Sequence, residues 1–147
     1  METVRAGRVW SDPMAGFPTE GMELTHILVC RDPSQARSFY VDVLGAEQYR
    51  EYGNSTVLRF LGAWLLLVEG GGPTEDKPTV TFAAPGDPDT VDHAFTIRVP
   101  DCRAAYETLL ARGAAFLTPP VESDWEVRAF FRDPDGHLFE ISEARAG

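Results

Sequence analysis

Apolar and polar positions along the chain follow the same plan twice. The first copy reads MELTHILVCRDPSQARSFYVDVLGAE and the second VDHAFTIRVPDCRAAYETLLARGAAF. Each begins with a strand-like apolar run, passes an aspartate, and continues with apolar residues at helical spacing up to a glycine. Three further strand-like runs follow each helix. The pattern predicts an α+β fold of two tandem βαβββ modules, which together form one curved, open, barrel-like sheet.

Both predicted helices carry start and stop signals. Asp32 and Asp101 precede the helical stretches and are good N-cap residues, and Pro33 suits the first helical position. Gly45 and Gly113 provide stops, because glycine readily adopts the left-handed conformation that ends many helices. The first helix presents one apolar face, formed by Ala36, Phe39, Tyr40, Val43 and Leu44.

The modules set the domain organisation. We expect a single domain over residues 22–147, with modules at 22–70 and 91–144. Residues 71–90 are rich in Gly, Pro and Asp, which is typical of a linker. Residues 1–21 show neither the helical nor the strand spacing of apolar residues and are expected to form an irregular N-terminal extension.

Composition narrows the function classes. The chain has 147 residues and a net charge of −10, which disfavours nucleic acid and anionic membranes as partners. No apolar run approaches the roughly 20 residues that span a bilayer, and the N-terminus lacks the apolar core of a secretion signal, so a cytoplasmic protein is expected. The two cysteines, Cys30 and Cys102, are distant in sequence and are expected to be free thiols.

Candidate chemistry recurs at matching positions of the two modules. His26 and His93 lie in the first apolar run of each module, and Glu69 and Glu140 lie in the last. An ionised carboxylate such as Glu140 inside an apolar strand is costly unless a positive charge pairs with it. Two imidazoles and two carboxylates converging in the hollow of a curved sheet would suit a divalent cation, which would balance both carboxylates.

Side-chain alternation gives an expected orientation for these strands. His26 shares a face with Leu28 and Cys30, and this face is expected to line the hollow. The opposite face, with Ile27 and Val29, is expected to pack against the helices.

Three segments, THILVCRDPSQARSFYVDVLG, DHAFTIRVPD and RDPDGHLFEIS, together resemble the vicinal oxygen chelate superfamily, also called the glyoxalase/bleomycin resistance/dioxygenase superfamily. The resemblance covers about residues 22–144 and implies the glyoxalase-like fold, a small-molecule substrate and a homodimer. It also implies metal ligands at His26, Glu69, His93 and Glu140, with nickel, cobalt, zinc or iron as the ion.

Three functions follow as alternatives. The first is a metal-dependent lyase or isomerase of the glyoxalase type, in which Glu140 or Glu69 acts as general base on a substrate that chelates the metal through adjacent oxygens. The second is an Fe(II) extradiol-type dioxygenase that uses His26, His93 and Glu140. The third is a metal-free antibiotic-binding protein like the bleomycin-resistance proteins, for which the acidic charge and several aromatic residues are suitable.

Other polar residues are weaker candidates. Arg59 and Arg128 lie in strands and are expected to anchor a carboxylate or phosphate of the substrate. Trp125 lies in a loop that is expected to cover the site. His137 directly follows the DPDG turn and is expected to be exposed.

Overall fold

The computed structural model describes residues 16–146, and it contains the two modules that the sequence predicts. The elements of the first module are β1 (Thr25–Cys30), α1 (Pro33–Ser38), the π-helical turn η2 (Phe39–Val43), β2 (Glu47–Tyr52), β3 (Ser55–Phe60) and β4 (Ala63–Glu69). Those of the second are β5 (Phe95–Arg98), α2 (Cys102–Ala111), β6 (Ala115–Phe116), β7 (Val121–Glu122), β8 (Glu126–Arg132) and β9 (Leu138–Ala144).

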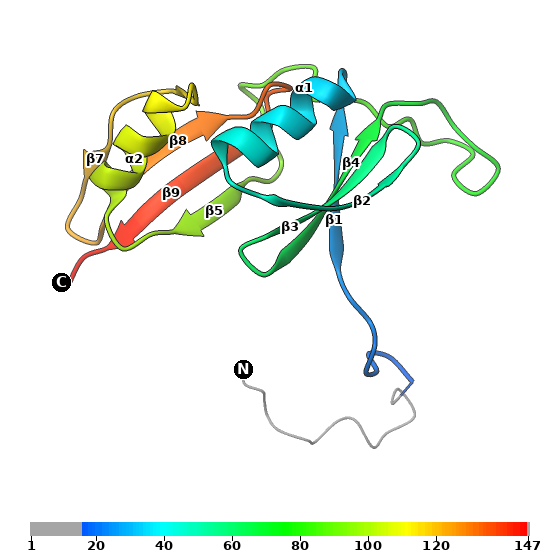
Figure 1. The fold of residues 1–147 in the computed structure, drawn as a ribbon, viewed down its shortest axis with the longest axis horizontal. Helices are drawn as coiled ribbons and strands as arrows, with labels where there is room; N and C mark the ends of the chain where they lie inside the picture. Colours follow the sequence, from blue (N-terminus) through cyan, green and yellow to red (C-terminus); the bar gives the residue numbers. More distant parts are fainter. Residues whose placement is uncertain (1–15, 147) are drawn as a thin grey trace.

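Each module forms its own mixed sheet with the same topology. The first sheet has the order β1-β4-β3-β2 and the second the order β5-β9-β8-β6, with β7 paired to β8. In both sheets the first strand runs parallel to the last, and the other pairs are antiparallel. The sheets are curved but do not close into a barrel, which confirms the predicted fold class (Figure 1).

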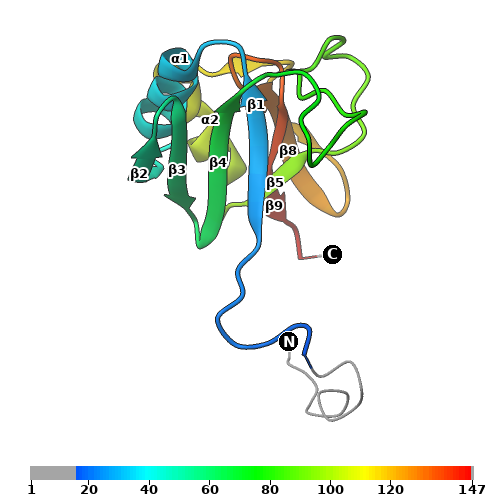
Figure 2. The ribbon, with the colours of Figure 1, turned by 90° about the vertical axis from the view of Figure 1, so that its right-hand side faces the viewer.

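The helices begin where the sequence predicts. The Asp32 side chain accepts hydrogen bonds from the backbone N–H groups of Ser34 and Gln35, and Asp101 accepts one from Ala104. Gly45 and Gly113 follow the helical segments with φ angles of 80° and 99°. The two helices lie on the same side of the molecule, in front of the strands in Figure 1 and to the left in Figure 2.

One apolar core joins the two modules on the helix side. Phe139 of β9 stacks on Phe95 and on Phe131, with ring centroids 4.7 and 5.2 Å apart. Tyr40 of the first module lies 6.0 Å from Phe139 and is fully buried. The other buried apolar residues of the core include Leu28, Cys30, Ala36, Leu58, Leu65, Leu67, Cys102, Ala129 and Ile141.

A buried hydrogen-bond network also joins the modules, at the turn between β8 and β9. The Tyr40 hydroxyl donates to Asp133 Oδ2 at 2.7 Å. Asp133 Oδ1 accepts from the backbone N–H groups of Asp135 and His137, and Asp135 accepts from the N–H of Arg31. Burial raises the pKa of Asp133, while the neighbouring His137 and Tyr40 oppose this change.

The linker between the modules is fixed at several points. Gly71 and Phe82 exchange two backbone hydrogen bonds as an antiparallel β-bridge. The chain also passes close to Gly70, where a Cβ atom would lie only 2.8 Å from the Phe82 carbonyl oxygen. Farther along, Arg31 donates to the Pro85 carbonyl at 2.7 Å and Arg132 pairs with Asp89 at 2.6 Å. The second half of the linker is therefore held across the junction of the two sheets.

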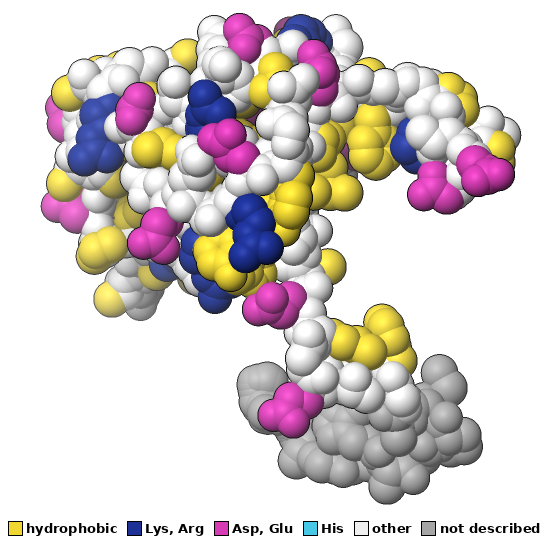
Figure 3. Space-filling view, turned by 45° about the vertical axis from the view of Figure 1, so that its right-hand side comes forward, with side chains coloured by type: hydrophobic (Ala, Val, Ile, Leu, Met, Phe, Trp, Pro, Cys, Tyr) yellow, Lys and Arg dark blue, Asp and Glu magenta, His cyan; other side chains and the backbone are white. Residues whose placement is uncertain are grey.

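Among residues 16–146, no helix has both the length and the apolar character that crossing a bilayer requires. Acidic and basic side chains are interspersed on the face shown in Figure 3.

Candidate functional site

The helices cover the face of the first sheet that carries His26, and not the face that carries Ile27, as was expected. Leu28 and Cys30 are 1% and 2% exposed and pack in the core on the helix side. Ile27, which was expected to meet the helices, is 44% exposed. The predicted orientation of β1 was therefore wrong. The residues share faces as predicted, but the helices cover the His26 face and leave the Ile27 face open.

This orientation places three of the four predicted metal ligands on different faces: His26 and Glu69 on one, and Glu140 on the other. His26 pairs with Leu65 and Glu69 pairs with Cys30 across the parallel strands β1 and β4, so both lie on the helix-side face. In β9 the core residues Phe139 and Ile141 alternate with Glu140, which places Glu140 on the open face of the second sheet.

The two histidines lie near each other at the edges of the sheets. The ring centroids of His26 and His93 are 5.1 Å apart, and His26 also meets the edge of Phe95 at 4.6 Å. Burial, followed by the charges of His93 and His137, lowers the pKa of His26, so the ring favours its neutral form. Glu69 lies at the exposed end of β4, where it accepts a hydrogen bond from Asn54.

Glu140 has protein partners on the open face. The Thr96 hydroxyl donates to Glu140 Oε1, and Arg128 Nη1 lies 3.7 Å from Oε2. The carboxylate therefore has a hydroxyl donor and a nearby guanidinium, which Arg128 shares with Glu126 at 3.6 Å, where a metal ion was expected. Of the three residues predicted to contact the substrate, Arg128 alone forms an ion pair with a predicted metal ligand within residues 16–146.

The donor set does not fit a shared metal ion. Within residues 16–146, no three His, Cys, Asp or Glu side chains lie close enough together to hold one ion.

The remaining sequence candidates lie apart from one another. Arg59 stacks over the Trp64 ring at 4.4 Å, and Trp125 is 75% exposed just before β8. Cys30 is a packed thiol whose Sγ donates to the Val68 carbonyl, and burial raises its pKa to about 11. At neutral pH it is therefore a protonated thiol rather than a reactive thiolate.

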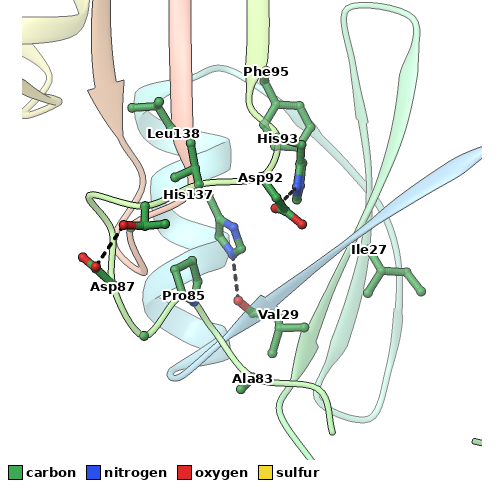
Figure 4. Close-up of a pocket in the computed structure, with 14 residues that line it drawn as sticks. Ile27, Val29, Ala83, Pro85, Asp87, Asp92, His93, Phe95, His137 and Leu138 are labelled. Atoms are coloured by element: carbon green, nitrogen blue, oxygen red, sulfur yellow. Dashed lines mark hydrogen bonds and ion pairs between the residues drawn. The ribbon is translucent and has the colours of Figure 1, made fainter. Parts of the chain in front are cut away.

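A cavity of about 450 Å³ lies between β1, the start of β9 and the second half of the linker (Figure 4). Its size suits a small organic molecule. Its wall consists of Ile27, Val29, Ala83, Pro85, Gly86, Asp87, Thr90, Val91, Asp92, His93, Phe95, Gly136, His137 and Leu138. Both modules and the linker contribute to it.

Two imidazoles, those of His93 and His137, converge on this cavity. His137 was expected to be exposed, but it is half-buried and its Nε2 bonds to the Val29 carbonyl oxygen at 2.8 Å. His93 Nδ1 bonds to Asp92 Oδ1 at 2.8 Å. Figure 4 shows both bonds as dashed lines. The Val29 contact spans 108 positions in sequence, so no local pattern signals it.

A family comparison agrees with this architecture. The model of the Glyoxalase/Bleomycin resistance protein/Dioxygenase superfamily matches residues 23–141, which is most of the chain. No curated protein sequence matches significantly.

Solved structures share the fold at low sequence identity. A glyoxalase/bleomycin resistance protein/dioxygenase from Nocardioides is 22% identical with a TM-score of 0.68, over 88% of this chain and 87% of its own. The fosfomycin resistance protein FosX from Listeria monocytogenes is 18% identical with a TM-score of 0.63, over 85% of this chain and 95% of its own. TioX from Micromonospora sp. ML1 is 22% identical with a TM-score of 0.60, over 85% of this chain and 100% of its own.

At these identities the structural neighbours establish the fold alone, while the family model covers both modules and the turn between β8 and β9. The chain belongs to the Glyoxalase/Bleomycin resistance protein/Dioxygenase superfamily.

Proposed function

We propose that this protein binds a small organic molecule in the cavity between its modules, without a metal ion. The observation that carries the proposal is the convergence of His93 and His137 on one ligand-sized cavity with apolar walls. Binding sites of this kind combine a mostly apolar lining with a few oriented polar groups.

The cavity is held in shape before any ligand arrives. Its linker wall is fastened to the first module by the Arg31 bond to Pro85 and to the second by the Arg132 pair with Asp89. His137 is held through Val29 and the Asp133 turn. A preformed site loses less conformational entropy on binding, which favours affinity.

Among the three functions that the sequence leaves open, this proposal corresponds to the metal-free binding protein. The lyase and the dioxygenase both require His26 and Glu140 to meet at one ion, and these residues lie on opposite faces of their sheets. Two FosX structures contain Mn(II), which is an observation about FosX and not about this chain.

A second hollow, of about 590 Å³, is a weaker candidate. It lies between the start of β1, the β3–β4 turn and β5, and its lining is mainly apolar, with Phe60, Leu65 and Phe139 among its members. His26 and Arg98 also reach it, but neither has a recorded side-chain hydrogen bond that would orient it for a ligand among the described residues.

A cavity-blocking variant tests the proposal. Val91 lines the cavity and is 42% exposed, so the larger Val91→Trp side chain is expected to fill part of the cavity without disturbing the core. Val80→Trp is the matched control, because Val80 is a 47% exposed linker valine outside the cavity lining. A panel of organic amines, alcohols and acids is screened for compounds that raise the melting temperature of the wild-type protein.

We expect the compounds that stabilise the wild type to lose at least about tenfold in affinity in Val91→Trp and to keep their affinity in Val80→Trp. Equal binding by the two variants would place the ligand elsewhere. A panel without a single binder would remove the support for a binding function. The homodimer expected from the family stays a prediction, which sedimentation of the full chain measures.

A further inference from the structure

We infer that the cavity selects a cationic ligand: a protonated amine attached to a compact apolar or aromatic group. The inference rests on the proposed binding function and adds the chemical class of the ligand. It follows from the hydrogen-bonding character of every polar side chain in the lining, and from the bonds that fix the two histidines.

Among the residues that the structure describes, the cavity lining contains hydrogen-bond acceptors and acids but no Lys or Arg side chain. Its carboxylates are Asp87 and Asp92, and its imidazoles are His93 and His137. The one side-chain hydroxyl that the described residues contribute to the lining, that of Thr90, donates to Asp87 at 3.1 Å. A ligand entering this site therefore meets groups that accept hydrogen bonds.

The hydrogen-bond partners assign the proton on each imidazole ring. The Val29 carbonyl oxygen can only accept, so His137 Nε2 carries the hydrogen and Nδ1 of the neutral ring keeps a free lone pair. The Asp92 carboxylate likewise accepts from His93 Nδ1, which leaves the lone pair on His93 Nε2. Both free ring nitrogens are acceptors suited to an N–H donor.

Asp92 acts mainly through His93. The Asp92 side chain is 96% exposed, so water screens its direct attraction for a ligand. Its bond to Nδ1 orients the His93 ring and keeps the acceptor nitrogen on the opposite side. Asp87 is held by its own turn, where it accepts from the Asp89 N–H and the Thr90 hydroxyl.

The apolar part of the cavity wall indicates the second feature of the ligand, its apolar or aromatic group. Ile27, Val29 and Leu138 line the sheet side of the cavity, and Phe95 adds an aromatic surface. An ammonium group alone would leave this surface unfilled, whereas an aromatic or branched amine covers it. An anionic ligand would meet two carboxylates, and the lining between residues 16 and 146 offers no Lys or Arg to compensate them.

Histidine NMR combined with three isosteric probes tests the inference. The chain has only three histidines, so their ring signals can be assigned by substituting each in turn. At pH 8 we expect His137 as the Nε2–H tautomer and His93 as the Nδ1–H tautomer. The probes are benzylamine, benzyl alcohol and benzoate, each titrated into the full chain.

We expect benzylamine to shift the His93 and His137 ring signals and to bind at least about tenfold more tightly than benzyl alcohol, with benzoate weakest. His93→Phe is expected to remove most of this preference, whereas Asp124→Asn, which changes an exposed acid outside the lining, is expected to preserve it.

Each contrary result has a distinct meaning. Equal affinity for the amine and the alcohol, both blocked by Val91→Trp, would overturn the cationic selectivity while leaving the proposed function standing. The opposite tautomers, or tighter binding of benzoate, would also overturn the selectivity. Absence of binding by all three probes and by the whole panel would overturn both.

Discussion

Replacing Asp133 with alanine is expected to lower the free energy of unfolding by about 3–5 kcal/mol, the range found when one partner of a buried polar network is removed. Asp133 is 6% exposed and accepts hydrogen bonds from the Tyr40 hydroxyl and from two backbone N–H groups of its own turn. Alanine would leave these three donors buried without their acceptor, and each unpaired group carries a desolvation cost.

Urea unfolding of Asp133→Ala and Asp124→Ala measures this effect. Asp124 is an exposed aspartate outside the recorded side-chain hydrogen bonds of the described chain, so its substitution is expected to change stability by no more than about 0.5 kcal/mol. Equal stability of the two variants would contradict the predicted role of Asp133 in the buried network. The effect is also expected to reach the cavity, because the same turn positions His137.

Phe139→Ala is the second change with a large expected effect, a loss of about 3–5 kcal/mol in the free energy of unfolding. Phe139 is 1% exposed and lies between Phe95 and Phe131, with rings nearly parallel to it at interplanar angles of 18° and 14°. Removing its ring would open a cavity at the centre of the core that both modules share.

Phe17→Ala provides a control for this second prediction, because Phe17 is 72% exposed and its substitution creates no buried cavity. Thermal and chemical unfolding of the two variants are compared under the same conditions. A Phe139→Ala protein as stable as Phe17→Ala would mean that the stacked aromatic residues do not form the core of the folded protein in solution.

Local signals made the elements predictable. Asp32 and Asp101 cap the two helices as expected because capping depends on neighbours within three residues. The repeated βαβββ order was visible because each module carries its own strand and helix periods. The first helix was expected to run without interruption to Leu44, whereas the structure changes to a π-helical turn from Phe39 onward.

The faces of the strands were not predictable from the chain alone. A period of two shows that His26, Leu28 and Cys30 share a face, but it does not say whether the helices cover that face or the other one. Both faces of β1 are apolar, since Ile27 and Val29 alternate with Leu28, so hydrophobicity left the choice open. The packing of the helices decides which face of β1 is covered, and that packing depends on contacts between residues far apart in sequence.

The partners of Glu140 and His137 were hidden for the same reason. Glu140 pairs with Thr96 and Arg128 because β9 lies between β5 and β8, a register that appears only when the sheet is assembled. His137 meets Val29 because the turn between β8 and β9 packs against the first module. His and Glu do occur at matching positions of the two modules in the sequence, but this match alone does not imply one shared site.

Titration of a ligand in the presence and absence of a chelator tests the central claim, metal-independent binding between the modules, most directly. The ligand is a compound whose binding Val91→Trp blocks and Val80→Trp preserves. The account predicts the same dissociation constant in excess EDTA and after addition of Mn, Fe(II), Co, Ni or Zn. Binding that disappears in EDTA, returns with one of these ions and is lost in Glu140→Gln would contradict it.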